Sequence, residues 1–65
     1  MLAEFAAAAV ARLDGDLQDI VHLKIYAGMT FARIAEIMKL PQGTVATRYR
    51  RAIQLLRDEF SRELL

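Results

Sequence analysis

The chain has 65 residues, enough for one domain (residues 1–65) with a small core and too few for two. Hydrophobic residues make up 55% and charged residues 26%, which is typical of a globular protein and not of a disordered tail. The absence of cysteine excludes disulfide bonds and thiolate metal sites, and agrees with a reducing cytoplasm.

Two targeting features are also excluded. No apolar run approaches the ~20 residues that a membrane span requires. The first residues carry the acidic Glu4 and no basic residue, which argues against a signal peptide. We therefore expect no membrane partner.

The net charge is only +1, but it is distributed unevenly. Five basic residues and no acidic residue occur between residues 39 and 57, whereas the flanking segments carry more acidic than basic residues. Such a local excess of positive charge is what a polyanion would meet.

The first two of four predicted helices lie in the N-terminal half. Apolar residues recur at i, i+3 and i+4 spacing up to Leu13 and predict the first helix. The stretch Asp14-Gly15-Asp16 breaks this helix, and Asp16 is the expected N-cap of a second helix that reaches Tyr26. Gly28 then stands where a left-handed residue commonly closes a helix.

The third and fourth helices are predicted on either side of Pro41. Thr30 is the expected N-cap of the third helix, whose inner face consists of Phe31, Ile34, Ala35 and Met38. Pro41 disfavours continuation of that helix and suits the first turn of a fourth one, from about Gln42 to near Arg62. Two helices joined by so short a turn form a helix-turn-helix over about residues 30–62. The prediction is an all-α, four-helix domain with no strand: a winged-helix-like three-helix core without a wing.

A helical wheel of ~100° per residue divides the fourth helix into two faces. The expected core stripe consists of Val45, Tyr49, Ala52, Leu56 and Phe60. The opposite face consists of Thr44, Thr47, Arg50, Arg51 and Gln54. Small residues permit close approach to a DNA major groove, arginines reach base edges or phosphates, and the helix N-terminus attracts phosphate. Arg48 lies at the edge of the apolar stripe, so packing, ion pairing and DNA contact all stay open for it.

Two segments resemble a known family. Residues 27–38 (AGMTFARIAEIM) and 40–52 (LPQGTVATRYRRA), followed by Leu56-Arg57, resemble region 4 of bacterial RNA polymerase sigma factors. The branch they are most similar to is the extracytoplasmic-function (ECF) type. The resemblance extends over about residues 10–60, nearly the whole chain.

This resemblance implies a four-helix domain that recognises the −35 promoter element and docks on the β-subunit flap of RNA polymerase. By position in the motif, the DNA-contacting residues would be Gln42, Gly43, Thr44, Ala46, Thr47, Arg48, Arg50 and Arg51. The family also implies a cytoplasmic, nucleoid-associated protein, and an anti-sigma factor or a second copy of the chain as further partners. Because 65 residues cannot hold the region that opens the −10 element as well, we expect a fragment, a truncated product or a stand-alone homologue.

Three positions depart from the family pattern. The family often has a basic residue where Ala46 stands and a phosphate-contacting arginine where Gln18 stands. Each lost phosphate contact lowers the salt slope of the binding constant by about 0.9, so weak DNA binding is expected. Lys39 replaces a common turn glycine, and a left-handed lysine would cost on the order of 1 kcal/mol.

No pattern indicates an enzyme, a cofactor, a metal or a small-molecule substrate. His22 has no second ligand at metal spacing, and Ser61 has no histidine near it. The carboxylates of Asp14, Asp16 and Asp19 are explained more simply by the start of a helix.

Two other functions remain open. A LuxR-type or other helix-turn-helix regulator shares the Thr-Val string, but that family usually has a histidine where Arg48 stands. A protein-interaction adaptor would keep the fold and bind polymerase or an anti-sigma factor without DNA, which the uncharged Gln18 and Ala46 favour. Leu55, Phe5 and Val10 are either parts of a small core or a docking surface for such a partner.

Overall fold

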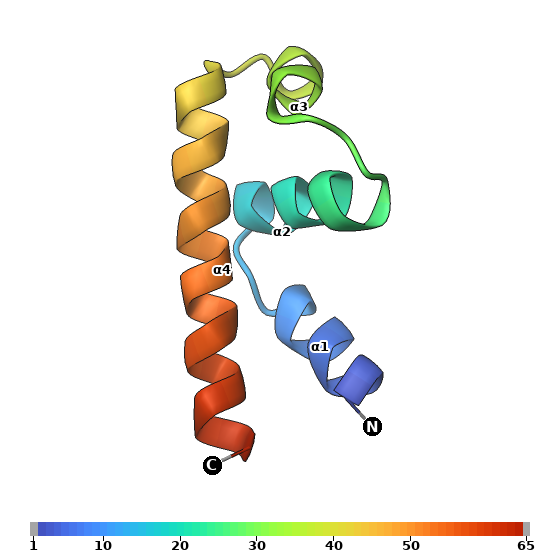
Figure 1. The fold of residues 1–65 in the computed structure, drawn as a ribbon, viewed down its shortest axis with the longest axis vertical. Coiled ribbons are helices and arrows are strands. Elements are labelled where there is room, and N and C mark those ends of the chain that lie inside the picture. The colour runs from blue at the N-terminus through green and yellow to red at the C-terminus, as the bar shows by residue number, and fades with distance from the viewer. Residues whose placement is uncertain (1, 65) are drawn as a thin grey trace.

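The computed structural model describes residues 2–64 of the chain, and the side chains of residues 4–62. Its elements are α1 (Leu2–Ala11), α2 (Gly15–Val21), the π-helix η1 (His22–Tyr26), α3 (Phe31–Met38) and α4 (Gln42–Leu64). Within that part of the chain no strand occurs, so the predicted all-α class is confirmed. The helices α1, α2 and α3 follow one another along one side of the long α4, and each contacts it (Figure 1).

The connection from α1 to α2 differs from the prediction. Helix α1 ends at Ala11, where the amides of Arg12 and Leu13 donate to carbonyls three residues back. The N-cap of α2 is Asp14 instead of Asp16, because Asp14 has the extended backbone and its carbonyl accepts from the Gln18 amide at 2.8 Å. The Asp14 side chain makes no capping hydrogen bond.

The second helix does not continue uniformly to Tyr26. After Val21 it widens into η1, where the Ala27 amide donates to the His22 carbonyl at 3.1 Å in the i to i+5 pattern of a π-helix. Gly28 then has φ of 69°, and the next amide donates back to the Leu23 carbonyl at 3.0 Å. The predicted left-handed closure at Gly28 is confirmed.

The helix-turn-helix connection follows the sequence closely. The Thr30 hydroxyl accepts from the Arg33 amide at 3.1 Å, which confirms the N-cap of α3. Lys39 has φ of 58° and ψ of 45°, so a lysine does occupy the left-handed position. The Leu40 amide donates back to Ala35 at 3.1 Å, and the Pro41 carbonyl accepts the first hydrogen bonds of α4.

Two hydrophobic clusters share α4. One consists of Val10, Val21 and Ala52, with Leu13, Leu17 and Leu56 against it. The other consists of Ile20, Ile34 and Val45, flanked by residues that include Leu40 and Tyr49. Val45 and Ala52 are completely buried, and Tyr49, Leu56 and Phe60 are half-buried, so the predicted core stripe of α4 is confirmed. Full burial of each large aliphatic side chain contributes about 1.5–3 kcal/mol.

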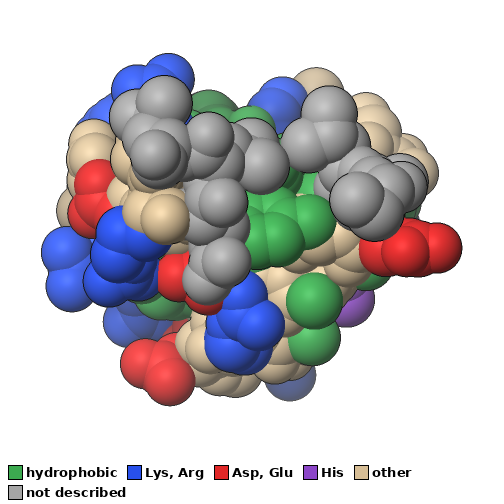
Figure 2. Space-filling model, turned by 90° about the horizontal axis from the view of Figure 1, so that it is seen from below, with side chains coloured by type: hydrophobic (Ala, Val, Ile, Leu, Met, Phe, Trp, Pro, Cys, Tyr) green, Lys and Arg blue, Asp and Glu red, His purple; other side chains and the backbone are tan. Residues whose placement is uncertain are grey.

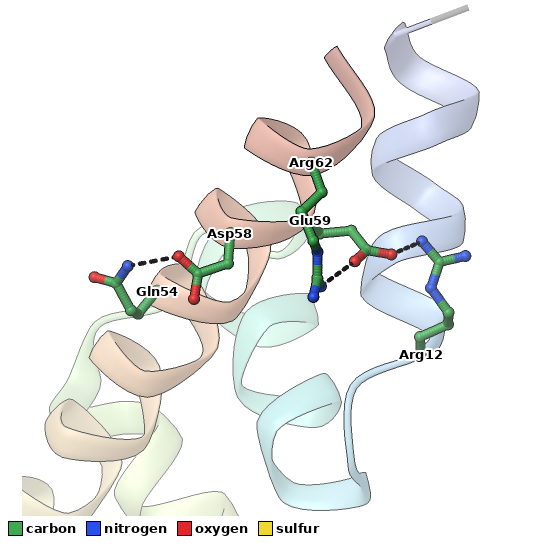
Figure 3. Close-up of polar contacts among 5 residues, drawn as sticks. All are labelled: Arg12, Gln54, Asp58, Glu59 and Arg62. Carbon is green, nitrogen blue, oxygen red and sulfur yellow. Dashed lines mark hydrogen bonds and ion pairs between the residues drawn. The ribbon is translucent and has the colours of Figure 1, made fainter. Parts of the chain in front are cut away.

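An ion-pair group fastens α1 to the C-terminal half of α4. The Glu59 carboxylate accepts from Arg62 at 2.7 Å and also pairs with Arg12 of the loop after α1 (Figure 3). The hydrogen bond from Arg62, and then that from Arg12, hold the pKa of Glu59 below its ordinary value of 4.5. Beside this group the Phe5 and Phe60 rings meet edge to face at 4.7 Å.

Replacing Lys39 by glycine should stabilise the domain. Glycine adopts the left-handed backbone without a Cβ clash, so Lys39→Gly should raise the free energy of unfolding by about 0.5–1 kcal/mol. This corresponds to a rise in melting temperature of about 2–8 °C for a domain of this size. The matched control is Lys39→Ala, which removes the charge and keeps the Cβ. Equal melting temperatures for the two variants would contradict the strain argument.

Glu59 should contribute stability that is lost in acid. Its folded-state pKa is lowered, so the contribution is present above the ordinary value of 4.5 and disappears as the pH falls through the lower folded value. The gap in melting temperature between the unmodified chain and Glu59→Gln should therefore be widest near neutral pH and close below pH 4.5. Circular dichroism melts from pH 7 to pH 3 measure it, with Asp58→Asn as the control. A gap independent of pH would rule this contribution out.

Candidate nucleic-acid interface

The candidate interface is the N-terminal part of α4, which follows the tight turn after α3. All eight predicted residues lie within its first ten positions. Exposed to solvent are Gln42, Gly43, Thr47, Arg50 and Arg51, and half-buried are Thr44, Ala46 and Arg48. They form a continuous face because the opposite side of the helix is held by Val45 and Tyr49 in the core.

The tip of this face is sterically open. A Cβ added to Gly43 would meet no atom within 4 Å, so nothing in the protein stands in front of the first turn. The amides of Thr44 and Val45 are used by the Pro41 carbonyl, at 3.0 and 3.1 Å. The open tip and the positive end of the helix dipole together favour the close approach of an anionic backbone.

Two arginines on this face have no intramolecular ion pair. Among the described side chains, Arg50 and Arg51 are exposed and contact no carboxylate within salt-bridge distance. Arg50 also borders a shallow hollow on α4 lined by Tyr49, Ile53, Gln54 and Arg57. Both guanidinium groups are available to an external anion without first breaking an ion pair.

Arg48 is different. Its Nη1 lies 2.5 Å from Oδ2 of Asp16 in the first turn of α2, so of the alternatives left open for Arg48 the structure shows ion pairing. The side chains are 39% and 60% exposed, respectively. The sequence analysis assigned Asp16 to a helix cap and missed this contact. No sequence signal indicates it, because the two residues are 32 positions apart.

The proposed docking residues of α1 prove to be core residues. Val10 is buried and Phe5 packs against Phe60, while Leu55 is half-buried in a groove between α1 and α4. Figure 2 views the end of the molecule where these helices meet and shows hydrophobic side chains among charged ones. The most exposed large hydrophobic side chains lie elsewhere, at Ile25, Tyr26 and Ile37.

Other kinds of site find little support in the part of the chain described. Residues 2–64 contain no group of three or more histidine, aspartate or glutamate side chains arranged to hold a metal ion. Among the described helices, none combines the length and the apolar character needed to cross a membrane.

One comparison with known proteins identifies a relative. The family model described as "Sigma-70, region 4" matches residues 9–58, which include every helix of the helix-turn-helix and the whole candidate interface. No curated protein sequence and no solved structure matches the chain.

Proposed function

Because the chain belongs to the sigma-70 region 4 family, a family of DNA-binding promoter-recognition domains, we propose that it recognises a −35 promoter element as region 4 of an ECF-type sigma factor. The observation that carries this proposal is the exposed pair Arg50 and Arg51, which is free of internal ion pairs on an open helix face. The family match favours this function over a LuxR-type regulator.

The proposed roles follow from position along α4. The small and polar side chains at the tip, Gln42, Gly43, Thr44 and Thr47, enter the major groove and contact base edges or nearby phosphates. Arg50 and Arg51 lie one turn further and reach base edges or the flanking backbone. Ala46 contributes only a small apolar surface, which suits contact with a thymine methyl group.

Polymerase is the second proposed partner. A domain that bound only DNA would not recruit an enzyme to the promoter, so we propose that another face docks on the β-subunit flap of RNA polymerase. An anti-sigma factor and a second copy of the chain are competing occupants of such a face. The proposed setting is the bacterial cytoplasm, at the nucleoid.

A second candidate function is an adaptor that binds polymerase without DNA. The uncharged Gln18 and Ala46 favour it, because both lack a phosphate contact that other family members have. A pull-down of polymerase that survives the double change of Arg50 and Arg51 to alanine, together with no DNA binding by the unmodified chain, would select the adaptor.

Removing either proposed base-reading arginine should weaken DNA binding. We expect Arg50→Ala and Arg51→Ala each to cost about 1–3 kcal/mol per base contact on the preferred duplex. Fluorescence anisotropy at low salt measures this with a duplex that the unmodified chain enriches from a random pool. Arg57→Ala is the matched control, an exposed arginine further along α4 whose loss should have a smaller effect. Unchanged binding in both variants would refute the recognition-helix assignment.

Restoring a basic residue at position 46 should strengthen binding. Ala46→Arg adds a cation beside the proposed groove-facing residues, so the salt slope of log K should steepen by about 0.9 for one new phosphate contact. Titrations at several salt concentrations measure the slope. Ala11→Arg adds the same charge at the exposed end of α1, far along the chain from the interface, and should leave the slope nearly unchanged. Equal slopes for the two variants would mean that position 46 does not face phosphate.

A further inference from the structure

The ion pair between Asp16 and Arg48 connects α2 to the flank of the proposed DNA-binding face. The Nη1–Oδ2 distance is 2.5 Å, and both side chains keep substantial exposure to solvent. A fully exposed pair would add little to stability, because water and salt screen it. Its position matters more, since it fixes where one guanidinium group of α4 points.

Arg48 shares a helical stripe with two residues of the proposed interface. Thr44, Arg48 and Arg51 are spaced i, i+4 and i+7, so their side chains are neighbours on the helix surface. Thr44 is half-buried and Arg51 is exposed, which places Arg48 at the boundary between the core and the open face. A duplex seated on that face would come close to the Arg48 guanidinium.

The contact with Asp16 leaves donors on Arg48 unused. A guanidinium group has five N–H donors in a rigid fork, and the carboxylate is bonded to Nη1. The Nη2 and Nε groups remain as donors, and guanine presents two acceptors, O6 and N7, at its major-groove edge. A carboxylate that already holds the side chain reduces the rotamer freedom lost when DNA binds.

We propose that Asp16 is a positioning residue for sequence discrimination: it holds Arg48 toward one base pair, most favourably a pair containing guanine. The proposal rests on the proposed function, because it requires the N-terminal half of α4 to lie in the major groove. It assigns to an acidic residue of α2 a role in selectivity, although an acidic side chain beside DNA opposes binding by charge alone.

The charge effect and the positioning effect predict different results for Asp16→Asn. If Asp16 acts only as a negative charge, the variant binds preferred and unrelated duplexes more tightly by the same factor, and their affinity ratio is unchanged. If Asp16 positions Arg48, the ratio falls by about three- to tenfold, the range expected when one side chain must be ordered by DNA alone. The ratio is independent of the folded fraction, so a loss of stability does not affect it.

The experiment uses the full chain and five variants: Asp16→Asn, Asp19→Asn, Arg48→Ala, Asp16→Asn with Arg48→Ala, and Arg51→Ala. Affinities are measured by anisotropy at one salt concentration for the selected duplex and for a scrambled duplex. Asp19→Asn is the matched control, since it removes the same charge from an exposed aspartate of α2 that has no ion pair among the described side chains.

The expected result is a fall in the affinity ratio for Asp16→Asn and none for Asp19→Asn. In the Arg48→Ala background, Asp16→Asn should leave the ratio unchanged, because the residue it positions is absent. Selection from a random pool should then show the same single base position relaxed in Asp16→Asn and in Arg48→Ala.

Other results would overturn the inference. An unchanged ratio in Asp16→Asn, or the same fall in Asp19→Asn, refutes positioning; if Arg51→Ala still weakens binding, the proposed function stands without it. Absence of any sequence-selective binding by the unmodified chain overturns both.

Discussion

Val45 and Ala52 of α4 lose all contact with solvent, and each does so against a different group of helices. Val45 packs with Ile20 and Ile34 of α2 and α3, whereas Ala52 packs with Val10 and Val21. The two residues lie about two turns apart on one stripe. The burial of this stripe orders three short helices that would be marginal in isolation, and therefore fixes the orientation of every other side chain of α4.

That orientation separates the basic residues into two groups. On the flanks of the stripe, arginines meet carboxylates from other elements or turns: Arg48 meets Asp16, and Arg12 and Arg62 meet Glu59. On the opposite face Arg50 and Arg51 meet none among the described side chains. The charge that the domain keeps for an external partner is thus narrower than the basic segment in the sequence, and lies on the part of α4 nearest the turn.

Local signals in the sequence were accurate wherever backbone chemistry alone decides. Gly28, Thr30 and the break before Pro41 predicted helix ends that the structure contains, because each depends on the φ angle or hydrogen bonding of a few neighbouring residues. The same local reasoning was wrong at Asp16, since Asp14 fulfils the backbone requirement of the cap equally well. It also gave no indication of the π-helix after Val21.

By itself, the sequence determined the helical class, the core stripe of α4 and the candidate face opposite that stripe, because helical periodicity places residues on faces without reference to other elements. Only the tertiary structure decided which arginines are paired, and that Phe5 and Val10 belong to the core and are not a docking surface. These outcomes depend on the distance between α4 and helices far away in the sequence. Asp16 and Arg48 meet only because burial of Ile20, Val21, Val45 and Ala52 brings α2 against α4.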